Sequence, residues 1–276
     1  MTGRRSEPVS ITARDIAPPA GPALGPAAAS ALADLLLAMA DDEFVIGFSD
    51  SEWTGIAPIL EEDVAMSSIA QDELGHARAI YELLAGLLHD GRDADAIAYD
   101  REPEAYRHAR LLDHGRGDWA MTMVRRFLYD TADAARLASI GEGWPPLAEL
   151  VAKIRREERY HVMHMTLWAE RLANGGGEAR SRFIAALEEL APDAGSVLVT
   201  PDGESALLEA RILSRPMADA ALAWRSEVAA ILGPLGITVD LVRGSQLRRG
   251  AEPSDAFRWL WGEFTSVRRS EPGATW

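Results

Sequence analysis

The chain has 276 residues and contains no cysteine. This absence excludes disulfide bonds, thiolate zinc sites, iron–sulfur clusters and cysteine nucleophiles. Any metal ion would therefore have to be bound by oxygen and nitrogen ligands.

Long apolar segments and excess basic charge are also absent. No stretch approaches about 18 uninterrupted apolar residues, and the N-terminus carries Arg4 and Arg5 without the apolar segment of a signal peptide. The 28 basic residues are outnumbered by 43 acidic ones, which gives a net charge of −15. We therefore expect a cytoplasmic protein for which neither nucleic acid nor a membrane is the main partner.

No segment shows the sustained period-two alternation of a β-strand, and the run at 197–200 is too short to build a sheet. Apolar residues recur instead at helical spacing, so the predicted fold class is all-α. Proline and glycine separate the expected helices, which cover 27–48, 59–89, 118–140, a segment from Pro146 to the glycines after Asn174, 178–190, 203–213 and 216–232.

Two domain-level expectations follow from composition. Residues 1–26 are rich in proline, alanine and glycine and are expected to form a flexible N-terminal extension. Residues 27–276 are expected to form a helical bundle domain with additional C-terminal helices as an appendage. Residues 91–117 are polar and irregular, which is typical of the long crossover between the hairpins of a bundle.

The chain contains two Glu-x-x-His motifs, Glu73–His76 and Glu158–His161, whose glutamates are 85 residues apart. Positions i and i+3 lie on one face of a helix, so each motif presents a carboxylate and an imidazole to the same point. One such motif often occurs by chance. The repetition of the motif is the informative feature.

Each motif is preceded by an acid at a similar distance. Glu43 lies 30 residues before Glu73, and Asp130 lies 28 residues before Glu158. In an antiparallel helix pair, residues equidistant from the turn stand at the same level, and the two midpoints, Pro58 and Trp144, fall within the local turn sequences. The spacing therefore predicts four helices that bring all six side chains together.

Four carboxylates and two imidazoles nearly neutralise two divalent ions, which matters because unpaired acids are costly in a dry bundle core. The ligand set suits iron, manganese or zinc. Such sites leave coordination positions open for dioxygen. We therefore predict two iron ions, other divalent transition metals being possible, bound by Glu43, Glu73, His76, Asp130, Glu158 and His161.

Several neighbouring residues remain as alternatives or supports. Asp133, one turn after Asp130, could replace it, Asp42 is a weaker rival of Glu43, and His164 could substitute for His161. Asp72 and Glu157 either accept the outer N–H of the histidine of the other motif or lie on a solvated face. The remaining predictions place His89, His108 and His114 at the surface, and Trp53, Trp119 and Trp168 in the core.

The segments EFVIGFSDSEW, APILEEDVAMSSIAQDELGHA and REERYH resemble the ferritin-like subunits of the phenylacetyl-CoA epoxidase complex. The resemblance covers roughly residues 30–276 and implies a ferritin-like bundle and a multicomponent oxygenase. Such an enzyme forms a ring epoxide on a CoA thioester, with electrons from a separate reductase subunit. The family has a catalytic chain, PaaA, and a companion chain, PaaC.

The resemblance points to both chains. The end of the sequence, PGATW, is similar to that of the companion chain, which is regarded as structural. The diiron ligands of the catalytic chain match the same six residues that the spacing selects. The chain is thus expected to be either a diiron oxygenase component or a scaffold with a retained or vestigial metal site, within an oligomer that contains the other ferritin-like subunit.

A last expectation concerns the C-terminal segment. Phe257, Leu260, Trp261 and Phe264 recur at helical spacing and form one apolar face. This face is predicted either to dock a partner subunit or to pack on its own bundle.

Overall fold

The computed structural model describes residues 21–199, 202–241, 249 and 252–271. Regular structure in these ranges is helical, apart from an isolated bridge between Ile140 and Leu213, and the all-α prediction is confirmed. Of the expected N-terminal extension, 1–26, residues 1–20 lie outside the described part of the chain. None of the described helices combines the length and the apolar character needed to span a bilayer.

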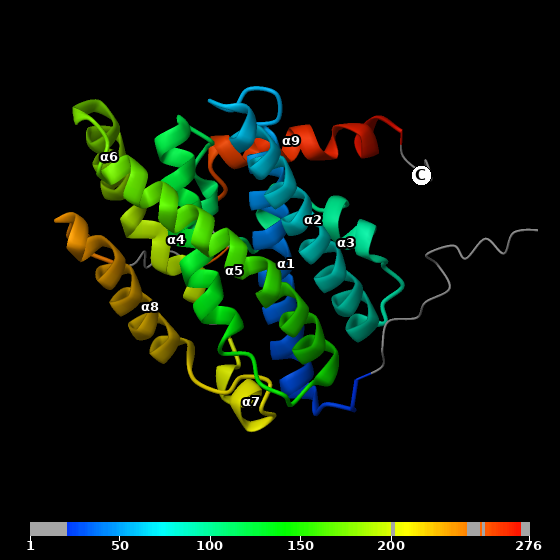
Figure 1. Ribbon diagram of the computed structural model, residues 1–276. Coiled ribbons are helices and arrows are strands. Elements are labelled where there is room, and N and C mark those ends of the chain that lie inside the picture. Colours follow the sequence, from blue (N-terminus) through cyan, green and yellow to red (C-terminus); the bar gives the residue numbers. More distant parts are fainter. Residues whose placement is uncertain (1–20, 200–201, 242–248, 250–251, 272–276) are drawn as a thin grey trace, which may run out of the picture.

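Four long helices form a ferritin-like bundle (Figure 1). Helix α1 pairs with α2, α4 pairs with α5, and α2 also packs against α5. The loops of the two hairpins contain Pro58 and Trp144, as the spacing predicted. The four helices are α1 (Pro26–Ser51), α2 (Leu60–Leu88), α4 (Trp119–Leu137) and α5 (Pro145–Ala173).

Local sequence sets where these helices begin and end. The Asp118 side chain accepts a hydrogen bond of 2.9 Å from the backbone N–H of Met121 and so caps α4. Prolines 145 and 146 occupy the first turn of α5, where a missing N–H costs nothing. Helix α2 stops at His89, which is left-handed with φ 48°. These ends fix the level at which the two motifs face each other.

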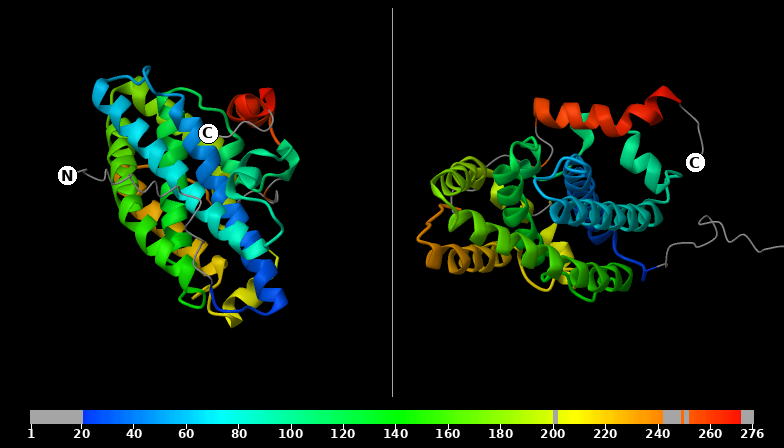
Figure 2. Two further views of the ribbon diagram at one scale, coloured as in Figure 1. Left: turned by 90° about the vertical axis from the view of Figure 1, so that its right-hand side faces the viewer. Right: turned by 45° about the horizontal axis from the view of Figure 1, so that its top comes forward.

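Additional helices cover the outside of the bundle (Figure 2). Helices α6 (Gly177–Ala194) and α8 (Met217–Leu232) pack against α4, and α7 (Glu204–Glu209) packs against α1. Helix α7 is shorter than the predicted 203–213, because the next residues turn to accept hydrogen bonds from the α4–α5 loop. The backbone N–H groups of Gly141 and Gly143 donate to the carbonyls of Ile212 and Arg211.

The crossover 91–117 is irregular, as predicted, and includes α3 (Ala94–Tyr99) and the 3-10 helices η2 (Pro103–Ala105) and η3 (Arg110–Asp113). It is nevertheless tied to the core. Asp41 accepts hydrogen bonds from Arg101 and from the backbone N–H of Arg107, and Asp42 accepts one from Ala109. Buried carboxylates on α1 therefore anchor a polar segment.

The surface prediction for the histidines holds for His89, which is exposed, and is wrong for His108. His108 is 2% exposed because α9 (Asp255–Ser270) covers the crossover, and its ring lies 4.1 Å from the Phe257 ring. His114 is half-buried and lies 2.9 Å from Asp193. The core prediction holds for Trp53 and Trp168, which are buried, while Trp119 is half-buried and packs edge-on against both.

Helix α9 lies across one end of the bundle, against α1 and the crossover (Figure 2). Its apolar face is buried. Phe257, Leu260 and Phe264 are buried, and Phe264 packs edge-on against Phe44 of α1 at 4.9 Å between ring centroids. Trp261 donates a hydrogen bond of 2.9 Å to the carbonyl of Arg101. Of the two predicted alternatives, packing on its own bundle is confirmed and docking of a partner by this face is wrong, because the crossover and α1 already cover it.

Candidate metal centre

Side chains from three helices converge in the middle of the bundle. The ligand atoms of Glu43 from α1, of Glu73 and His76 from α2, and of Glu158 from α5 all lie within 4.8 Å of one another. All four residues are buried. Four of the six predicted ligands therefore form a group of potential metal ligands within the described residues. The other two, Asp130 and His161, are not in this group.

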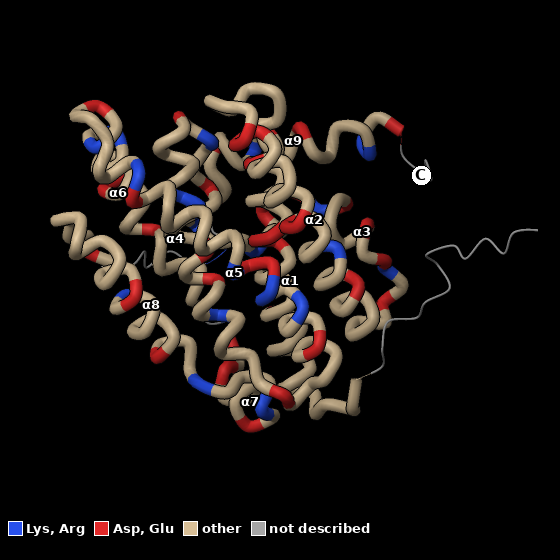
Figure 3. Tube along the Cα trace, in the orientation of Figure 1, with Lys and Arg blue, Asp and Glu red and all other residues tan. Residues whose placement is uncertain are grey.

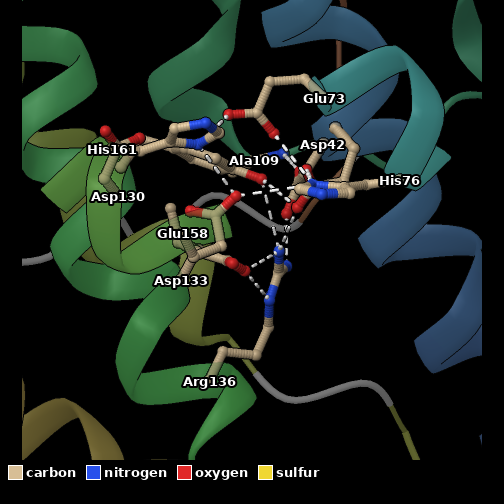
Figure 4. A network of polar contacts seen from close by, with 12 residues as sticks. Asp42, Glu73, His76, Ala109, Asp130, Asp133, Arg136, Glu158 and His161 are labelled. Carbon is tan, nitrogen blue, oxygen red and sulfur yellow. Dashed lines mark hydrogen bonds and ion pairs between the residues drawn. The ribbon is translucent and has the colours of Figure 1, made fainter. Parts of the chain in front are cut away.

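The two imidazoles flank the glutamates of the Glu-x-x-His motifs (Figure 4). His76 Nδ1 lies 3.5 Å from Glu158 Oε1 and 3.8 Å from Glu73 Oε2. His161 Nδ1 lies 3.1 Å from the same Glu158 oxygen and 3.3 Å from Glu73 Oε1. Ligand atoms about 2.0–2.2 Å from a common ion stand about 3–3.5 Å apart, so these separations suit coordination.

The outer nitrogens of the two rings contact carboxylates of the opposite motif. His76 Nε2 lies 2.7 Å from Glu157 Oε2, and His161 Nε2 lies 3.4 Å from Asp72 Oδ2. Both predicted contacts are present. A carboxylate that accepts the outer N–H orients the ring and leaves Nδ1 facing the cluster.

Asp130 does not belong to the converging group, because it is paired with Arg126, a residue that the motif analysis missed. Arg126 Nη2 lies 2.9 Å from Asp130 Oδ1, and Arg126 Nη1 donates a hydrogen bond of 2.6 Å to Glu73 Oε1. All three side chains have no solvent exposure. Arg126 lies one turn before Asp130 on α4, and that spacing was the available signal.

The alternative acids are also paired with arginine. Asp133 accepts a hydrogen bond from Arg136 Nε at 2.7 Å, and Asp42 contacts both Arg136 and Arg249. Asp42 is thus engaged away from the cluster. Asp133 has one buried oxygen without a hydrogen-bond partner, so both it and Asp130 remain candidates on α4.

Tyr129 is a further residue that the motif analysis missed. Its hydroxyl donates a hydrogen bond of 3.0 Å to Glu43 Oε1, and the side chain is fully buried. This contact holds Glu43 at the level of the motifs. His164, the possible substitute for His161, lies instead 2.9 Å from Glu62.

Charged groups gather where α1, α2 and α5 approach one another (Figure 3), and burial shifts their pKa values. Burial and the Glu73 carboxylate raise the pKa of Glu43 well above its usual range. On Glu73, burial is outweighed by Arg126 and by hydrogen bonds from Glu43 and the histidines, which hold its pKa well below its usual range.

Burial alone would lower the pKa of each imidazole, but the neighbouring carboxylates outweigh it. Hydrogen bonds to Glu43 and Glu73 raise the pKa of His76 to about 12. Hydrogen bonds to Glu158 and Glu73 raise the pKa of His161 to about 11. In the metal-free protein, protons on the rings therefore balance part of the buried negative charge, which is the role that metal ions would take.

Two buried carboxylate oxygens without hydrogen-bond partners are a second observation that fits a metal centre. Oε2 of Glu73 and Oε2 of Glu158 are buried without a hydrogen-bond partner, although both belong to side chains of residues at most 2% exposed. A buried carboxylate oxygen without a partner is costly, and a bound cation would satisfy it.

A cavity of 460 Å³ lies beside the centre, between α4, α5 and α8. Glu158 forms part of its wall. The rest of the lining combines apolar side chains with arginines: Ala134, Leu137, Ala152, Val162, Arg155, Arg156 and Arg159, together with Glu227. Among the described cavities, it is the one that touches a member of the converging group.

Comparisons with known proteins identify the family of the chain. The family model described as "Phenylacetic acid catabolic protein" matches residues 21–276. The chain belongs to this family. Within it, the C subunit of 1,2-phenylacetyl-CoA epoxidase from Escherichia coli (strain K12) is 29% identical over 244 residues, which cover 87% of this chain and 97% of the relative. The chain therefore resembles the PaaC type of the family.

Proposed function

We propose that the chain is a metal-carrying subunit of a phenylacetyl-CoA epoxidase of aerobic phenylacetate degradation. The observation that carries this proposal is the convergence of two Glu-x-x-His motifs on shared buried carboxylates, with a carboxylate behind each imidazole. Family membership and the similarity to an epoxidase subunit support the same function.

The residues that would hold two iron ions are Glu43 and His76 on one side, His161 and Asp130 on the other, and Glu73 and Glu158 between them. Bound iron would supply dioxygen activation and oxygen-atom transfer to an aromatic ring. The protein itself supplies the positions of the ligands and a core from which water is excluded.

The cavity at Glu158 supports access by a small apolar molecule such as dioxygen, and its basic rim suits an anionic substrate. Arg155, Arg156 and Arg159 lie on one stretch of α5 and outnumber the two acids of the lining, Glu158 and Glu227. The phosphates of a CoA thioester carry the complementary charge.

The proposal includes assembly of the chain with other subunits. The relative is named as one subunit of an epoxidase, which implies further subunits. We propose that the chain assembles with a second ferritin-like subunit and receives electrons through a reductase subunit. Co-purification of the three chains tests the assembly.

A structural role is the second candidate function, and two observations favour it. The similarity is to the PaaC type, and the Arg126 guanidinium already balances part of the charge of the cluster. In this case metal, if bound, would stabilise the fold, and turnover would depend on the partner chain.

Reconstitution separates the two functions. The complex is assembled with wild-type chain or with Glu73→Ala, and dioxygen-dependent epoxide formation is measured along with iron content. Loss of turnover with assembly intact supports a catalytic centre in this chain. Unchanged turnover by a complex whose variant chain holds no iron supports the structural role.

A further inference from the structure

Arg126 is a fixed positive charge inside the candidate metal centre. It contacts Glu73 at 2.6 Å, Asp130 at 2.9 Å and Asp50 at 3.4 Å, all without solvent exposure. The Arg126 guanidinium thus interacts with the carboxylates of Glu73 and Asp130, and a metal ion shared by these two carboxylates would have to compete with it.

The opposite side of the centre has no such arginine contact at comparable distance. Around His76, Glu43 Oε2 lies at 3.4 Å and Glu158 Oε1 at 3.5 Å, while the nearest arginine contact of Glu43 is Arg136 at 3.9 Å. A cation on the His76 side therefore meets carboxylate oxygens without displacing a close ion pair.

Charge balance separates the two sides further. When all four predicted acids are ionised as ligands, they carry four negative charges, and the Arg126 guanidinium reduces this to three. The other acids near Arg126 and Asp130 have arginines of their own, since Asp50 pairs with Arg125 and Asp133 with Arg136. One divalent ion thus leaves a single excess negative charge, whereas two ions leave an excess positive charge in a dry core.

We propose that the two metal positions are unequal: an ion on the His76 side binds first and tightly, and Arg126 keeps the position at His161 and Asp130 weak. This inference rests on the proposed function and specifies how this chain loads its centre. Binding of the second ion requires that Asp130 separate from Arg126.

The test is an anaerobic titration of metal-free protein with Mn²⁺, followed by electron paramagnetic resonance and by metal content after equilibrium dialysis. For the wild type, the second ion should bind at least about 100-fold more weakly than the first, because it must break a buried ion pair. Arg126→Gln should reduce this difference to less than about tenfold, and Arg126→Lys should preserve it.

Two variants serve as matched controls. Arg125→Gln alters an equally buried arginine that contacts Ser49 and Asp50 but none of the predicted ligands, and it should leave the difference unchanged. Asp130→Asn should abolish the second binding step and leave the first within about twofold. It tests whether Asp130 belongs to the weaker position even if Arg126→Gln fails to fold, and Arg126→Lys then tests the role of the arginine.

Each outcome has a separate meaning. Two ions of equal affinity in the wild type, or equal weakening of both steps by Asp130→Asn, would overturn the inference while the proposed function stands. Absence of any bound metal in every variant would instead remove the proposed metal centre itself.

Discussion

The hairpins α1–α2 and α4–α5 carry the same sequence pattern but treat their first acid differently. In α1–α2, Glu43 joins the converging group and receives a hydrogen bond from Tyr129. In α4–α5, Asp130 has no hydrogen bond and is held by Arg126 instead. Equal spacing thus gives equal placement of the backbone and unequal electrostatic surroundings.

The residue one turn earlier explains the difference. Four positions before Glu43 stands Met39, a buried apolar side chain, whereas four positions before Asp130 stands Arg126. Neighbours at i and i+4 share a helix face, so this single position decides whether the acid meets an internal cation. The spacing of the acids and the motifs thus places the ligands, and the residue one helical turn before each acid determines which charges surround it.

The largest expected effect removes the carboxylate that both hairpins share. Glu158 Oε1 lies close to both imidazoles, so Glu158→Ala should weaken both binding steps by more than about 100-fold. In the metal-free protein the change also leaves the protonated His161 ring without its nearest carboxylate, so the melting temperature should fall as well. Metal content and thermal unfolding measure the two effects.

Glu178→Ala is the control for this variant, since Glu178 is exposed on α6 and pairs with Arg182. It should retain wild-type metal content. Equal metal content in the two variants would contradict the assignment of α5 to the centre.

A smaller effect should distinguish the two outer carboxylates. Glu157 contacts His76 at 2.7 Å, whereas Asp72 contacts His161 at 3.4 Å. Glu157→Gln should weaken the first binding step about 10-fold or more, and Asp72→Asn should act mainly on the second and by less. Both changes keep the side-chain size, and the Mn²⁺ titration reads each step. A reversed order would show that the hairpins do not load as separate halves.

The sequence predicted the parts of the site that depend on helix periodicity. Glu-x-x-His spacing and hairpin midpoints placed Glu43, Glu73, His76 and Glu158 together, and they identified the contacts of Asp72 and Glu157. The motif spacing and the hairpin midpoints are both informative because the rise and the rotation per residue are the same in every α-helix.

What depends on packing between distant segments could not be predicted. His108 is buried because α9 crosses the crossover, and the C-terminal apolar face packs inward because Phe44 and Tyr106 meet it. Amphipathic spacing shows that a face is buried but does not reveal what covers it. The contact of Arg126 with Glu73 likewise joins two hairpins and leaves no local pattern, whereas its i, i+4 spacing to Asp130 can be read from the sequence.

The smallest expected effect tests how closely the first hairpin must pack. Gly47 follows Glu43 by one turn, and a Cβ there would lie 3.1 Å from Glu73 Cβ and 3.2 Å from the Ala70 carbonyl oxygen. Gly75, on the neighbouring helix, is exposed with no atom within 4 Å of such a Cβ. Both substitutions to alanine gain the same helix propensity, about 1 kcal/mol, so their difference isolates the crowding.

Gly47→Ala should therefore be about 1–3 kcal/mol less stable than Gly75→Ala in denaturant unfolding. Because α1 must move away from α2 at the level of Glu73, the variant should also weaken the first metal-binding step and leave the relation between Asp130 and Arg126 unchanged. Gly75→Ala should match or exceed the wild type in stability and bind metal normally. Equal stability of the two variants would mean that α1 can shift freely at this level, and that close approach in this hairpin does not account for the better convergence of its ligands.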